Sequence, residues 1–163
     1  MLFSRVPLAL AIVLLVAPAA TAASTRPMTA TVVSTAYNQD LKATILVTAT
    51  GLTLYEYVGD VPTQRPYPFC INDPTYHCSK LWPPLLTTGK PVAGKGVKAS
   101  LLGTVVRDDN HKTQVTYAGH PLYRYAGGVS GPPDKKAGDV YGQDAVGIWY
   151  VLSPSGKPIK KPR

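Results

Sequence analysis

Hydrophobic and polar residues alternate along short segments of this chain, which is the pattern of β-strands with one buried face. Residues 43–58 combine a β-branched run, a connection ending in Gly and a second alternating run, so they predict a β-hairpin. Residues 113–126 have the same layout and predict a second hairpin. No long segment has the period of an amphipathic helix after residue 24. The pattern therefore predicts an antiparallel, all-β protein.

Shorter segments predict the remaining strands. One strand is expected to start at residues 31–34 and to reach a turn at 37–40, and another is expected at 103–106. Residues 148–152 are predicted to form a closing strand. The two prolines within residues 82–86 confine that segment to a sheet edge or to an extended path outside a sheet.

The sequence LYEYVGD at residues 54–60 returns in altered form as LYRYAGG at residues 122–128. A shift of 68 residues without a gap gives seven identities across sixteen positions, and a shift of 67 aligns the later segments around the two Trp residues. We interpret the chain as a duplication with units at about 31–91 and 104–158. Two units favour one small pseudo-symmetric sandwich or barrel, because stacked solenoids need three or more.

Aromatic residues recur at matching places in both units. They are Tyr55, Tyr57, Tyr123, Tyr125, Trp82 and Trp149. In strand geometry the two Tyr of each unit point to the same face. A Tyr ring suits a core with internal hydrogen bonds and also suits a surface that stacks on sugar rings or cations. Recurrence in both units favours packing, and the stacking surface remains the alternative.

Composition supports short strands and many turns: only 16% of residues are charged, and Pro (16), Gly (14) and Tyr (10) are abundant. The length of 163 residues fits one domain with a modest core, which we place at residues 31–158. The expected oligomeric state is a monomer.

The first residues are typical of a secretory signal. Residues 1–22 carry Arg5, an apolar run and a small-residue ending, and residues 23–30 are expected to form a disordered leader. The apolar run is shorter than the ~20 residues that span a bilayer, so no transmembrane segment is expected after cleavage. No Cys precedes Cys70, so no lipid anchor is expected. These features predict a secreted, periplasmic or cell-envelope protein.

The chain is basic, with 17 Lys and Arg against 9 Asp and Glu and a net charge of +8. Loss of Arg5 with the signal leaves 16 against 9, or +7. Such a surface attracts anionic envelope polymers or acidic glycans, whereas a specific nucleic-acid partner is not indicated. The alternative is that scattered charge only provides solubility. The cluster at residues 159–163 is expected to be a solvated tail.

Cys70 and Cys78 are the only two cysteines, and in an oxidising compartment they are expected to form a disulfide. A zinc site would need further ligands at suitable spacing, and His77 alone does not complete one. The disulfide is therefore favoured over a metal or redox role.

Several segments in a fixed order carry a family resemblance: AYNQDLKATILVTATGLTLYEYVGD, WPPLL, GKGVKASLLGTVVR, QVTYAGHPLYRYAGG and AGDVYGQDAVGIWYVLSPSG. Together they resemble the bacterial secreted-repeat family that is also called lipoprotein with Yx(FWY)xxD motif. The resemblance implies an exported β-rich repeat protein of unassigned activity. The motif transfers to Tyr55, Tyr57 and Asp60, whereas Gly128 occupies the place of the acid in the second unit. Because Gly suits turns as Asp does, we favour a turn-forming role for Asp60 over a ligand or catalytic role.

No catalytic constellation is evident. Nucleophile elbows, the H-E-x-x-H motif and phosphate-binding Gly loops are absent from the sequence, so an enzyme is not expected. No cofactor is implied. Weak candidates for metal binding are Asp108, Asp109, His111 and His120, and a weaker oxygen-ligand set is Asp139, Gln143 and Asp144. Both sets are more readily explained as turn residues in water.

Three functional interpretations remain. The first is a non-catalytic exported binding or envelope-associated module that contacts an anionic envelope polymer or glycan. The second is a structural or stress-protective protein without a small ligand, and the third is a metal or redox protein.

Overall fold

The computed structural model describes residues 30–163. The predicted signal at 1–22 and nearly all of the predicted leader at 23–30 lie outside the described residues. Within residues 30–163, no helix is both long and apolar enough to cross a membrane.

Short strands dominate the described chain, which confirms the all-β class. The strands are β1 (Val32–Asn38), β2 (Ala43–Thr48), β3 (Tyr55–Tyr57), β4 (Val92–Ala93), β5 (Leu102–Val106), β6 (Thr113–Tyr117), β7 (His120–Pro121) and β8 (Trp149–Val151). The helical elements are α1 (Cys78–Leu81) and a single 3-10 turn (Ala99–Leu101), neither of which the hydrophobic pattern predicts.

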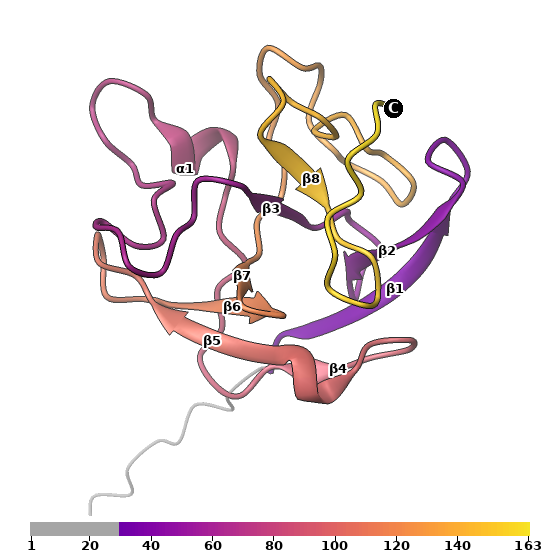
Figure 1. Ribbon diagram of the computed structural model, residues 1–163, viewed down its shortest axis with the longest axis horizontal. Coiled ribbons are helices and arrows are strands. Elements are labelled where there is room, and N and C mark those ends of the chain that lie inside the picture. The colour runs from indigo at the N-terminus through magenta and orange to yellow at the C-terminus, as the bar shows by residue number, and fades with distance from the viewer. Residues whose placement is uncertain (1–29) are drawn as a thin grey trace, which may run out of the picture.

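Three small sheets make up the fold, with strand orders β2-β1-β4, β3-β8 and β5-β6-β7. Figure 1 shows β1 and β2 on one side of the molecule, β5 to β7 on the other, and β3 with β8 between them. The two long connections, one containing α1 and the other at residues 127–147, lie at the end of the molecule opposite β4. The sheet order therefore brings both long loops near the central β3-β8 pair.

The first strand is longer than predicted. β1 pairs antiparallel with β2 from Val33 opposite Thr48 to Asn38 opposite Ala43. The side chain of Asn38 accepts a hydrogen bond from Leu41 N at 2.9 Å and donates to Gly138 O at 3.0 Å. These bonds place the turn after Asn38 instead of at 37–40, because the Asn side chain closes the turn from the strand end.

The predicted hairpin at 43–58 forms only in its first part. Leu54 N donates to Leu46 O at 3.1 Å, so the return segment begins beside β2. The chain then leaves β2, and Tyr55–Tyr57 pairs antiparallel with Trp149–Val151. Tyr55 makes both of its backbone hydrogen bonds with Tyr123, on the side of the strand opposite to the bond between Leu54 and Leu46.

Backbone hydrogen bonds join the first and second halves of the chain. Tyr55 N donates to Tyr123 O and Tyr123 N donates to Tyr55 O, each at 2.9 Å. Leu46 N likewise donates to Leu152 O at 3.0 Å.

The matching bond in the second half runs from Val115 N to Leu85 O at 2.8 Å. In this bond pattern Leu46 corresponds to Val115. The correspondence differs by one residue from the gapless alignment, because the turn after β6 is one residue shorter than the turn after β2. The division into units 31–91 and 104–158 stays a prediction.

The core consists of two groups of buried side chains. One contains most of the aromatic residues, and the other is largely aliphatic and includes Leu46, Leu54, Leu122 and Leu152. The aliphatic group lies where the two hairpins meet, because it is made by residues of both.

The residues after Ile159 are exposed, as expected of a solvated tail, but the backbone of this segment is hydrogen-bonded to the body of the protein. The amide of Gln143 donates to Ile159 O and Lys161 O, each at 2.7 Å. The Arg163 guanidinium lies 4.8 Å from the centre of the Tyr141 ring. Hydrogen bonds to the backbone hold this segment in place regardless of its charge.

Candidate ligand pocket beside the aromatic core

Trp82 and Trp149 stack face to face at the centre of the molecule. Their ring centroids lie 3.8 Å apart and their planes differ by 3°. Tyr57 covers the outer face of Trp149 at 4.7 Å, and Tyr125 lies against Trp82 at 4.5 Å. The two Trp faces are therefore occupied by protein side chains, and only their edges are available to a ligand.

Tyr55 and Tyr123 meet the same two Trp rings edge-on. Tyr55 lies 5.4 Å from Trp82 and Tyr123 lies 5.2 Å from Trp149, at interplanar angles of 78° and 89°. Both tyrosines are fully buried. These rings are core residues and do not form a surface on which a sugar stacks.

The hydroxyl group of each buried tyrosine donates a hydrogen bond to a carboxylate in the other half of the chain. Tyr55 Oη bonds to Asp134 Oδ2 at 2.6 Å, and Tyr123 Oη bonds to Asp60 Oδ2 at 2.6 Å. Burial raises the pKa of both tyrosines above the ordinary range, and the nearby carboxylate raises it further. The phenols are therefore protonated donors at any physiological pH.

Asp60 does more than form a turn. Its backbone N–H closes the turn by donating to Tyr57 O at 3.1 Å, as the turn prediction implies. Its side chain, however, accepts hydrogen bonds from Phe69 N and from Tyr123 Oη, both at 2.6 Å. Burial raises the pKa of Asp60 to about 6, against the lowering effect of these two hydrogen bonds.

The second half has its own acid, which sequence reasoning missed. Asp134, not Gly128, supplies the carboxylate that accepts the hydrogen bond from the Tyr55 hydroxyl. The alignment placed Gly128 opposite Asp60, and Asp134 lies six residues after Gly128 in the same loop. The Gly at 128 is therefore no argument against a side-chain role for the motif acid.

Arg107 is a further residue that the sequence did not single out. Its guanidinium is fully buried and donates to Gln114 Oε1 and Cys70 O, each at 2.6 Å, and also pairs with Asp109 at 2.9 Å. The neighbouring Phe69 N is held by Asp60. The partly buried Asp60 and the fully buried Arg107 thus fix two consecutive residues of the loop that contains the disulfide.

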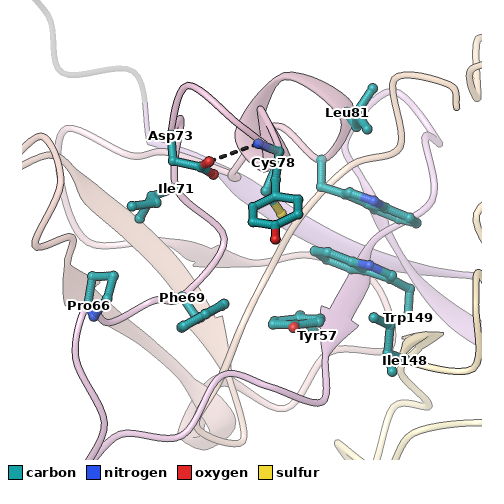
Figure 2. Close-up of a pocket in the computed structure, with 11 residues that line it drawn as sticks. Tyr57, Pro66, Phe69, Ile71, Asp73, Cys78, Leu81, Ile148 and Trp149 are labelled. Atoms are coloured by element: carbon teal, nitrogen blue, oxygen red, sulfur yellow. Dashed lines mark hydrogen bonds between the residues drawn. The ribbon is translucent and has the colours of Figure 1, made fainter.

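The disulfide between Cys70 and Cys78 is formed, as predicted. Together with the anchors at Phe69 and Cys70 it shapes the loop into one wall of a pocket of about 610 Å³ (Figure 2). The pocket is lined by Tyr57, Pro66, Phe69, Ile71, Asp73, Tyr76, Cys78, Leu81, Trp82, Ile148 and Trp149. Figure 2 shows Tyr57 and Phe69 side by side along one wall, with Trp149 beyond Tyr57.

The lining is apolar with one charged group. Five of its residues are aromatic, and Asp73 alone among them is charged. Asp73 Oδ1 accepts hydrogen bonds from Thr75 N and Tyr76 N, each at 2.8 Å. The bond from the Tyr76 N–H, with help from Thr75, keeps the pKa of Asp73 below its ordinary value. The pocket therefore contains a carboxylate beside an aromatic wall.

Comparison with known protein families gives a match that covers the second half of the aromatic core. Residues 103–153 match the model of a family described as a secreted repeat of unknown function. The resemblance to the secreted-repeat family is confirmed. The matched secreted repeat includes Tyr123, Tyr125, Asp134 and Trp149, so it covers the second half of the aromatic core. No curated protein and no solved structure matches the chain.

The four weak metal candidates of the chain serve other contacts. Asp108 accepts a hydrogen bond from Tyr67 N at 2.8 Å, and Asp109 pairs with Arg107. His111 is exposed, and His120 Nδ1 lies 3.3 Å from Glu56 Oε2. Over residues 30–163 no three His, Cys, Asp or Glu side chains are grouped so that they hold a metal ion.

The oxygen-ligand set is also dispersed. The amide of Gln143 bonds to Ile159 O, Lys161 O and Val151 N, and Asp139 Oδ2 accepts from Lys135 N and Lys136 N. Each group is used to hold a loop or the C-terminal segment. Their bonding is structural, as the turn interpretation predicts.

Proposed function

We propose that this is an exported, non-catalytic binding protein whose aromatic pocket receives the apolar part of a small ligand. The observation that carries the proposal is the pocket of about 610 Å³, lined almost entirely by aromatic and aliphatic side chains. Small-molecule sites are typically concave, mostly apolar and provided with few polar groups. The pocket has each of these properties.

The anchoring of the pocket wall supports a binding role. Phe69 is held through its N–H by Asp60, Cys70 through its carbonyl by Arg107, and Cys70 again by the disulfide to Cys78. A wall that is already ordered loses little conformational entropy when a ligand binds, which increases affinity.

The chemistry of the lining favours binding over catalysis. Among the lining residues the only groups that exchange protons readily are Asp73 and the hydroxyls of Tyr57 and Tyr76. General acid–base or nucleophilic catalysis needs a nucleophile and a base within hydrogen-bond reach. No Ser, Thr, His or Lys is among the lining residues of the pocket.

An anionic envelope polymer suits the surface better than the pocket. The lining residues include no Lys or Arg, so an acidic group inside the pocket would lie beside Asp73 without a cation. Polymer contact is therefore proposed only for the basic surface outside the pocket. Co-sedimentation with purified cell-wall polymer at low salt, lost at high salt, tests that second role.

Intrinsic fluorescence tests the pocket directly, because both Trp residues of the protein line it. A neutral apolar probe, N-phenyl-1-naphthylamine, is expected to bind with one-to-one stoichiometry and to change Trp emission. Leu81→Gln, which places an amide in the lining, is expected to weaken binding by about tenfold or more. Val129→Gln is the matched control, since Val129 is 93% exposed and lies outside the pocket.

The structural or stress-protective alternative predicts a different result. A protein without a small ligand gives no saturable change in Trp emission with any probe. Equal effects of Leu81→Gln and Val129→Gln would also contradict the proposal, because the probe would then be binding elsewhere.

A further inference from the structure

Charge is unevenly distributed around the pocket. The sequence has 17 Lys and Arg against 9 Asp and Glu, yet Asp73 is the one charged residue in the lining. The lining thus carries one formal negative charge and no Lys or Arg, whereas the chain as a whole has a net charge of +8.

The carboxylate is held in place by its own turn. Both hydrogen bonds, from Thr75 N and Tyr76 N, go to Oδ1. No side chain or backbone group of residues 30–163 donates a hydrogen bond to Oδ2. Figure 2 shows Asp73 at the rim, with its hydrogen bond to the neighbouring backbone nitrogen. One oxygen thus positions the group, and the other is available to a ligand.

The Arg and Lys side chains next to the pocket form no ion pair with Asp73. Arg65 precedes the lining residue Pro66, but its guanidinium lies 3.4 Å from Asp108 and donates to Pro62 O and Gln64 O. Lys80 in α1 is exposed and is not part of the lining. No cation of the described chain lies within 4 Å of the Asp73 carboxylate.

Aromatic rings line the same pocket as the Asp73 carboxylate. Phe69 and Tyr76 are exposed ring residues of the same loop, and Tyr57 stacks on Phe69 with centroids 6.3 Å apart. The faces of such rings attract cations, and the attraction grows as the cation loses water. An apolar body can contact Ile71 and Leu81 in the same cavity.

We propose that the pocket selects a cationic amphiphile: a ligand with an ammonium group, preferably quaternary, attached to an aromatic or aliphatic body. This inference rests on the proposed function and adds the ligand class. The ammonium lies between Asp73 Oδ2 and the rings of Phe69 and Tyr76, and the body occupies the apolar part. A quaternary group is preferred because one free carboxylate oxygen cannot satisfy the three N–H donors of a primary ammonium.

Three probes with the same benzyl group separate charge from apolar burial. They are benzyltrimethylammonium, benzyl alcohol and phenylmethanesulfonate, each titrated against Trp emission. The cation is expected to bind about tenfold tighter than the alcohol, and the anion to bind weakest. Asp73→Asn keeps an oxygen for the turn but removes the charge, so it is expected to abolish the preference for the cation and leave binding of the alcohol unchanged.

Asp40→Asn is the matched control, because Asp40 is exposed, lies outside the pocket and changes the net charge by the same amount. If Asp40→Asn reduces the preference as much as Asp73→Asn, or if the alcohol binds as well as the cation, the inference is overturned while the proposed function stands. If none of the three probes nor the neutral naphthylamine binds, the proposed function itself fails.

Discussion

The hydroxyl of Tyr123 donates to the carboxylate of Asp60, 63 residues earlier in the chain, across a distance of 2.6 Å. The same carboxylate accepts from Phe69 N in the pocket wall. One partly buried acid thus links the aromatic core to the loop that shapes the candidate site. A change in its charge is expected to affect both.

Stability is expected to depend on pH through Asp60. Its pKa rises from 3.8 in the unfolded chain to about 6 in the folded protein, so the folded state holds the proton more tightly. Its contribution is fully present below pH 3.8 and is lost as the pH rises through 6. The free energy of unfolding should therefore fall between pH 4 and pH 7 by up to about 3 kcal/mol on account of this residue.

Urea unfolding monitored by Trp emission at several pH values measures this dependence. Asp60→Asn is expected to flatten the profile between pH 4 and pH 7, because the amide does not titrate. A variant whose stability falls as steeply as that of the wild type would show that Asp60 is not the group responsible.

The buried phenol of Tyr55 contributes separately from its ring. Tyr55→Phe leaves Asp134 Oδ2 without its 2.6 Å donor, which is expected to cost about 1 to 3 kcal/mol of unfolding free energy. Tyr55→Ala also removes the ring from the core and is expected to cost about 3 to 5 kcal/mol. Tyr37→Phe, on an exposed ring, is the control and should change stability by less than about 0.5 kcal/mol.

Calorimetry or urea unfolding distinguishes these variants. An equal, small effect of Tyr55→Phe and Tyr37→Phe would contradict a structural role for the hydroxyl. A cost of Tyr55→Ala below about 0.5 kcal/mol would instead indicate an exposed ring.

Arg107 is expected to be the most sensitive basic residue. Arg107→Met keeps the apolar length but leaves Asp109, Gln114 Oε1 and Cys70 O without their donor, at a cost of about 3 to 5 kcal/mol. Arg65→Met removes a largely exposed partner of Asp108 and should cost no more than about 1 kcal/mol. Similar losses of unfolding free energy in the two variants would show that the buried hydrogen-bond network of Arg107 adds nothing to stability.

Loss of the disulfide is expected to loosen the pocket wall. Its bridge spans a sequence separation of 8, so the double variant Cys70→Ala/Cys78→Ala should lose about 2 to 3 kcal/mol of stability. Because Cys78 lines the pocket, probe affinity should fall as well. Chemical reduction of the wild type should reproduce both effects, and unchanged probe binding would show that the loop keeps its shape without the bridge.

Short-range patterns predicted much of the secondary structure. The strands expected at residues 43–48 and 113–117 match β2 and β6, and the two Cys of one loop form the predicted disulfide. These features depend on neighbours in sequence: strand alternation, turn residues and an eight-residue separation between thiols. They can therefore be predicted from a single sequence without the tertiary structure.

Other features depend on residues that are far apart. Nothing local to residues 55–57 indicates that β3 leaves its hairpin to pair with β8, because the partner strand is more than ninety residues away. The burial of Glu56, beside His120 and with Oε1 lacking a hydrogen-bond partner among the described residues, is equally unexpected for a charged residue. The pairing of distant strands determines both the partner of β3 and the burial of Glu56.

By itself, the sequence determined the all-β class, the recurrence of the aromatic residues and the disulfide, because composition, spacing and periodicity carry that information. Only the tertiary structure decided what those residues do. It placed Trp82 against Trp149, gave each buried Tyr a carboxylate from the other half, and left Asp73 beside the aromatic wall of a pocket. The physical reason is that burial and hydrogen-bond geometry are set by contacts between distant segments, which no local pattern encodes.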